Sequence, residues 1–142
     1  MGEAREIMDR VTQAIFSKDM KAAAKLYASD AVALTPDRGE VRGNDNIVAW
    51  ASELFDAFPD ARYEMLNSYE AGNTAIDEGY FEGTHTGPLH DPAGGEIPAT
   101  GKSVRLLTCD IATVENELIT SHHFYYDQMA FMAQLGLMEE TT

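Results

Sequence analysis

Residues 61–72 read ARYEMLNSYEAG, and three further stretches of the same extended character follow: AIDEGYFEGTHTG (75–87), KSVRLLTCDIATV (102–114) and ELITSHHFYYD (117–127). Each is bounded by Gly, Asn or Pro, the residues that favour turns. The pattern predicts four long strands in an antiparallel meander. Residues 87–101 are the exception, because their many Gly and Pro residues predict a long irregular loop that shapes the mouth of a site.

The part of the chain before these strands has helical periodicity. Apolar residues recur at helical spacing through residues 1–28 and predict two short helices. A short strand is expected at residues 31–35, before a loop. A third helix is expected from Gly43 or Asn44 onward, with Asn44 or Asp45 as its N-cap.

The order of elements indicates the fold class. Helices followed by a run of antiparallel strands predict an α+β domain, which we expect to span residues 1–142. A last short helix is expected at residues 128–138. The N-terminal helices would pack on one face of a curved sheet, which can form a cone around a cavity lined by every second residue of each strand.

Composition and charge exclude several classes of function. The 142 residues are 44% hydrophobic and 24% charged, as in soluble globular domains. The formal net charge of −14 disfavours nucleic acid and anionic lipid as partners. A single Cys, the lack of a signal-peptide pattern in the first residues and the lack of a long apolar run predict a cytoplasmic protein without a membrane segment.

Alternation along the strands predicts which side chains face the cavity. Glu78 and Glu82 are best left in solvent, which turns Phe81 and His85 to the other, interior face. In the last strand both alternating sets contain aromatic residues. The pattern alone therefore leaves open which set of the last strand is interior.

Four motifs, in order, resemble the SnoaL-like polyketide cyclase family of the nuclear transport factor 2-like superfamily: Gly43-x-x-x-Ile47, Phe58-Pro59-Asp60, Gly83-Thr84-His85-x-Gly87, and Asp127 followed by Gln134-Leu135-Gly136. The resemblance runs from about residue 5 to residue 137. It implies a cone-shaped α+β fold and a cyclase that needs no cofactor.

The resemblance also implies site residues. Asp127 matches the family's carboxylate, which acts as general acid and base in the cavity. The parity of Asp127 places His123 and Tyr125 on the pocket side, with His123 as a second catalytic residue where the family often has Trp. The alternative is that Asp127 only caps the helix that begins at Gln128.

Further residues are candidates for substrate binding. His85 can orient a substrate carbonyl or can simply hold the turn beside it. Trp50, Phe58 and Phe81 can line a hydrophobic pocket or can pack in the core. His122 and His123 point to opposite faces of one strand, so no metal site is expected.

These observations predict a cofactor-independent cyclase or isomerase acting on a small hydrophobic carbonyl compound. Asp127 would remove a proton next to a carbonyl, and the enolate would close a ring by an intramolecular aldol step. The alternatives are a hydratase, epoxide hydrolase or ketosteroid isomerase-like enzyme of the same fold, and a small-molecule binding module. A homodimer is expected through the outer face of the sheet, where Tyr80, Phe124 and Tyr126 would otherwise be exposed.

Overall fold

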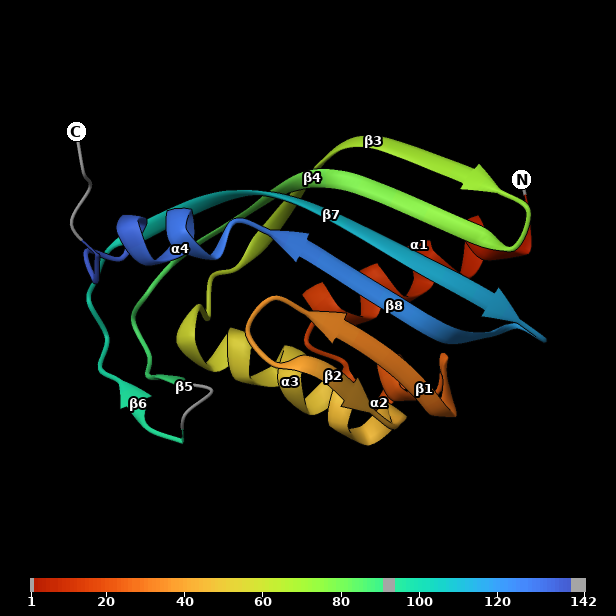
Figure 1. Cartoon of the computed structure of the whole chain (residues 1–142), viewed down its shortest axis with the longest axis horizontal. Coiled ribbons are helices and arrows are strands. Elements are labelled where there is room, and N and C mark those ends of the chain that lie inside the picture. The colour runs from red at the N-terminus through yellow and green to blue at the C-terminus, as the bar shows by residue number, and fades with distance from the viewer. Residues whose placement is uncertain (1, 91–93, 139–142) are drawn as a thin grey trace.

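The computed structural model describes residues 2–90 and 94–138 (Figure 1). The helices are α1 (Glu3–Phe16), α2 (Met20–Ala24), α3 (Asn44–Ala57) and α4 (Gln128–Gln134). The strands are β1 (Tyr27–Thr35), β2 (Gly39–Arg42), β3 (Arg62–Ala71), β4 (Thr74–Thr84), β5 (Leu89–His90), β6 (Glu96–Ile97), β7 (Ser103–Glu115) and β8 (Leu118–Tyr126).

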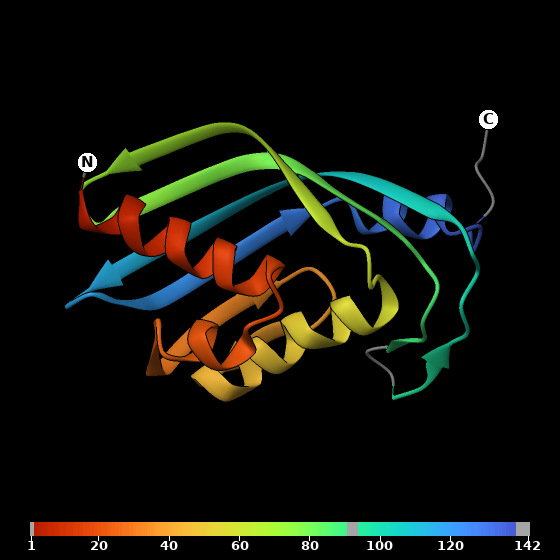
Figure 2. The ribbon, with the colours of Figure 1, turned by 180° about the vertical axis from the view of Figure 1, so that it is seen from behind.

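Six strands form one sheet in the order β2-β1-β8-β7-β4-β3. Neighbouring strands are antiparallel except β1 and β8, which run parallel. The sheet is strongly curved, and α1, α2 and α3 lie together on its concave side (Figures 1 and 2). The predicted α+β class and the antiparallel meander are confirmed.

Several local predictions were wrong in detail. Residues 39–42, expected in a loop, form β2 as the hairpin partner of β1. Gly43 rather than Asn44 or Asp45 is the N-cap of α3, and its φ of 91° is a backbone conformation that glycine adopts without strain. Part of the expected irregular loop forms a small separate sheet, in which β5 pairs with β6.

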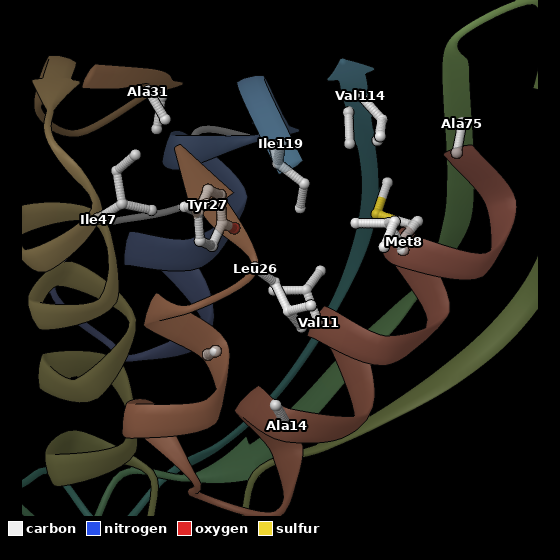
Figure 3. Packing of buried hydrophobic residues seen from close by; sticks show 14 of the residues in the cluster. Met8, Val11, Ala14, Leu26, Tyr27, Ala31, Ile47, Ala75, Val114 and Ile119 are labelled. Carbon is white, nitrogen blue, oxygen red and sulfur yellow. The ribbon is translucent and has the colours of Figure 1, made fainter. Parts of the chain in front are cut away.

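Two apolar clusters hold the helices on the sheet. The larger one packs the inward stripe of α1, including Met8 and Val11, against Val114 and Ile119 of the sheet (Figure 3). The other surrounds Phe58 and Phe131, where the end of α3 meets α4.

A β-bulge in β8 determines which of its residues face the helices. Thr113 of β7 lies opposite Ser121, whereas the next residue, Val114, lies opposite Ile119. Thr120 is therefore an extra residue in β8, and the alternation of side chains shifts by one position there. Ile119 and His122 are both buried although they are three residues apart.

The bulge corrects the facing predicted for the last strand. Beyond Thr120 the concave face carries the even-numbered residues His122, Phe124 and Tyr126. The expectation that His123 faces the pocket, and that Phe124 and Tyr126 lie on the outer face, was wrong for this reason. By contrast, the expected facing of β4 is confirmed, because its interior and outer residues alternate in burial without interruption.

Candidate active site

A cavity lies between the helices and the concave face of the sheet. The cavity has a volume of about 150 Å³. Its walls are mainly apolar and aromatic, and come from α1, α3, α4 and the middle of the sheet: Val11, Ile15, Phe16, Ile47, Trp50, Leu54, Phe55, Phe81, Leu106, Phe124, Tyr126 and Phe131. A wall of this kind suits a small, flat hydrophobic ligand.

Three polar side chains form a chain of hydrogen bonds in the sheet wall of this cavity. The Tyr27 hydroxyl lies 2.6 Å from Nδ1 of His122, and Nε2 of His122 lies 2.7 Å from Oδ2 of Asp110. Tyr27 and His122 are almost completely buried, and the Asp110 side chain is 16% exposed. All three residues line the cavity, and Asp110 is the most exposed of them.

The hydrogen-bond partners indicate where protons lie among these three side chains. A carboxylate can only accept, so the Nε2–H of His122 donates to Asp110. Burial, with a smaller contribution from the charge of Asp110, raises the pKa of Tyr27 far above its usual value. The phenol therefore keeps its proton at neutral pH, and its hydroxyl shares a hydrogen bond with Nδ1 of His122. Asp110 is held in place by His122 while Oδ1 remains able to accept another proton.

A buried ion pair lies beside Asp110. Asp77 of β4 is directly opposite Asp110 in the sheet and is 1% exposed. The guanidinium of Arg5 lies 2.7 Å from Asp77 and 2.6 Å from Asp9. Burial raises the pKa of Asp77, the hydrogen bond from Arg5 opposes this, and the charge of Asp110 raises it further. Arg5 thus supplies positive charge next to the carboxylates of Asp77 and Asp9.

Polar residues also form part of the cavity wall. The indole Nε1 of Trp50 donates to both carboxylate oxygens of Asp37, at 3.2 and 3.3 Å. Arg38 pairs with Glu53 at 2.8 Å. All four residues line the cavity, so this part of its wall is polar and its groups are paired with one another.

The structure brings together some of the predicted binding residues. Trp50 and Phe81 line the cavity, and the Trp50 ring lies 4.9 Å from that of Phe124. Tyr125 contributes to the lining, but its side chain lies largely on the other face and is 46% exposed. Phe58 is fully buried in the core and does not line the cavity.

His85 is also a core residue. It is fully buried, stacks 5.4 Å from Phe58 and accepts the backbone N–H of Thr100 at Nδ1, 3.2 Å away. Burial lowers its pKa, which the backbone of Gly87 opposes. The structure thus places His85 as a support for the loop after β4, and it is absent from the cavity wall.

The two residues predicted to be catalytic do not meet in the cavity. The carboxylate of Asp127 is exposed and accepts the N–H of Ala130 at 3.0 Å, as the N-cap of α4. His123 lies on the outer face, with Nδ1 3.3 Å from the Tyr125 hydroxyl. Neither residue is part of the cavity lining.

Sequence reasoning missed Tyr27, Asp110 and His122. Asp110 carried a signal, because it is an acidic residue between the apolar residues Cys109 and Ile111, with alternation that turns it to the same face as Leu106 and Val114. His122 could not be separated from His123 without knowledge of the bulge. Among the described residues, no group of three or more His, Cys, Asp or Glu side chains could hold a metal ion.

No helix in the described part of the chain is long and apolar enough to cross a membrane. None of the curated proteins matches this chain significantly. Solved structures, in contrast, share its fold at low sequence identity.

One similar structure is a protein from Jannaschia sp. CCS1 assigned as a SnoaL-like polyketide cyclase, with a TM-score of 0.85, 15% identity, and coverage of 96% of this chain and 94% of that one. Another is IdmH from Streptomyces antibioticus, assigned as a polyketide cyclase, with a TM-score of 0.77, 20% identity, and coverage of 95% and 99%. AclR from Streptomyces galilaeus, assigned as a hydroxylase, has a TM-score of 0.81, 17% identity, and coverage of 99% and 89%.

At these identities the structures establish a shared fold, that of nuclear transport factor 2-like proteins. The family itself is established by sequence. The profile described as SnoaL-like polyketide cyclase matches residues 5–135, nearly the whole chain. The chain therefore belongs to the SnoaL-like polyketide cyclase family.

Proposed function

We propose that the protein catalyses proton transfer next to a carbonyl group of a small, flat, hydrophobic ketone, leading to aldol ring closure or isomerisation. The observation that carries the proposal is a cavity-facing carboxylate, Asp110, held by His122 within an apolar enclosure. Asp110 would take the α-proton, and His122 would keep the carboxylate oriented. The family assignment and the cyclase-like neighbours support this class of reaction.

The polar groups favour catalysis over simple binding. A binding module needs an apolar wall and a polar group or two that fix orientation. Here a buried Tyr, His and Asp are joined in one chain of hydrogen bonds whose end is open to the cavity. A buried set of hydrogen bonds of this kind is useful when a base such as Asp110 must be held in one geometry.

The proposal is testable before the natural substrate is known. 2-Tetralone is a flat bicyclic ketone whose α-hydrogens exchange with D₂O when a base removes them. We expect the protein to accelerate this exchange, measured by ¹H NMR, and 2-naphthol to inhibit it by occupying the same cavity. A rate equal to that of buffer containing heat-denatured protein would contradict the proposal.

Asp127→Asn distinguishes between Asp127 and Asp110 as the general base. As a general acid and base, Asp127 would be irreplaceable, and the variant would lose about 100-fold or more of the exchange rate. Because its carboxylate is exposed and caps α4, we expect the rate and melting temperature to stay close to wild type, since Asn is also a good N-cap. A large loss of the exchange rate at unchanged melting temperature would show that Asp127, not Asp110, is the base.

The outer face of the sheet supports the homodimer as part of the proposal. Leu107 is 53% exposed and Tyr125 is 46% exposed there. Tyr80 lies between them and the sheet edge, with the Arg105 guanidinium 3.5 Å from its ring centre. Exposed apolar residues grouped on a curved sheet are typical of a subunit interface.

We expect light scattering to report a dimer at micromolar concentration, and Leu107→Glu to shift it to monomer, because the variant would bury an unpaired charge in the interface. Lys21→Glu, on an exposed site of α2, is the control and should remain dimeric. A wild-type monomer under these conditions would rule out the dimer.

A further inference from the structure

Tyr63 has a buried hydroxyl without a partner in the cavity wall. It belongs to β3, lines the cavity and packs with its ring centre 5.7 Å from that of Phe16. Among the described residues, its hydroxyl oxygen is buried and makes no hydrogen bond. A buried hydroxyl that lacks a partner destabilises a fold, so its presence beside a cavity points to a partner that arrives with a ligand.

Gly79 provides the space that this phenol occupies. Strand β4 lies between β3 and β7, and Gly79 is an interior residue of β4. A Cβ atom at Gly79 would lie 2.6 Å from Cζ and 2.7 Å from the hydroxyl oxygen of Tyr63. The absence of a side chain on β4 thus lets the phenol from β3 lie across it, toward β7.

The end of the phenol is therefore directed toward the part of β7 that carries Asp110. Thr108, two residues before Asp110 and opposite Gly79, donates its own hydroxyl to the Gly79 carbonyl at 3.2 Å. Burial, followed by the negative charge of Asp110, raises the pKa of Tyr63 well above its usual value, and the neighbouring Thr108 side chain opposes this shift. The phenol stays protonated at neutral pH and is available as a donor.

We propose that the Tyr63 hydroxyl donates a hydrogen bond to the enolate oxygen of the ligand whose α-proton passes to Asp110. The inference rests on the proposed function. In the step, Asp110 accepts the proton, the C–H electron pair forms the new C=C bond, and the carbonyl π pair moves onto the oxygen. A donor placed at that oxygen stabilises the charge that develops there.

The proposal also defines the ligand class. The carbonyl oxygen and the acidic C–H must lie on adjacent carbons of a flat molecule that fits between Tyr63 and Asp110. Phenols have the same arrangement as an enol, since their O–H can donate to Asp110 while their oxygen accepts from Tyr63. Enolisable bicyclic ketones and their phenol analogues are therefore the expected ligands.

The test compares 2-naphthol with naphthalene, which has the same rings without the oxygen, by fluorescence titration of wild type and Tyr63→Phe. We expect the variant to bind 2-naphthol about tenfold more weakly and naphthalene with unchanged affinity. Its melting temperature should stay the same or rise, because an unpartnered buried hydroxyl is removed. Tyr69→Phe, on the same strand but 55% exposed, should behave as wild type in every measurement.

The outcomes are distinct. Equal affinity of wild type and Tyr63→Phe for 2-naphthol would overturn the role of Tyr63 and leave the proposed function standing. An equal loss of affinity for 2-naphthol and naphthalene in Tyr63→Phe would also overturn the role of Tyr63, because such a loss would show a general change in packing. If neither ligand bound to wild type, the cavity would not accept flat bicyclic compounds, and the proposed function would fall together with this inference.

Discussion

Asp110→Asn should lower the rate of 2-tetralone exchange by about 100-fold or more, the usual contribution of a general base. Asn has nearly the same shape as Asp, and its carbonyl oxygen can still accept the Nε2–H of His122, which lies 2.7 Å from Asp110 in the native site. It cannot take a proton from carbon. The fold should therefore survive while the reaction is lost.

The matched control is Asp30→Asn, which removes one carboxylate from an exposed position of β1 and should keep the full rate. Melting temperatures of both variants, measured with the exchange rates, show whether a loss of rate follows a loss of structure. Exchange at the wild-type rate by a folded Asp110→Asn would disprove the role of Asp110 as the base.

Arg5→Met should produce the largest loss of stability among the variants considered. Arg5 is nearly buried, and its guanidinium pairs with Asp77 at 2.7 Å and reaches the carbonyls of Tyr69 and Ile76 at 3.4 and 3.5 Å. Met fills similar space but leaves the carboxylate of Asp77 buried without a cation. Removing one partner of a buried pair costs about 3 kcal/mol or more of unfolding free energy.

Urea denaturation at pH 7 measures this loss. Arg10→Met, on an exposed site of the same helix, is the control and should change the unfolding free energy by less than about 0.5 kcal/mol. A loss of similar size in both variants would mean that the ion pair with Asp77 contributes nothing specific.

The pH dependence of Arg5→Met has a definite sign. Burial already raises the pKa of Asp77 in the folded protein, and Arg5 opposes that shift. Without Arg5 the folded-state pKa rises further above the unfolded value, so the folded state binds the proton more tightly. The stability deficit relative to wild type should therefore shrink as the pH is lowered from 7 to 5. A deficit that stays constant or grows would contradict this account of the pair.

The fold could be predicted from the sequence because its signals are local and regular. Uninterrupted alternation in β4 correctly turned Phe81 inward and Glu82 outward. The cap of α4 was also predictable, since Asp127 directly precedes the helix and needs no distant partner. The family resemblance then supplied the cone-shaped arrangement of these elements.

The site was less predictable because it depends on contacts between distant parts of the chain. The hydrogen bond from Tyr27 to His122 joins residues 95 positions apart, and no local pattern specifies it. The choice between His122 and His123 depends on a single extra residue, Thr120, which has no turn-forming character. Tyr63 has room only because the strand beside it has no side chain at Gly79.

The bulge at Thr120 makes the length of β8 a variable that the cavity can tolerate. Deleting that one residue would leave Ile119 opposite Val114 and Ser121 opposite Thr113, so regular pairing would be restored with His122, Phe124 and Tyr126 still facing the helices. A gene that loses this codon would thus keep the inner surface of the cavity. Within this fold, the last strand can lose one residue at the bulge without a change in the side chains that would meet a ligand.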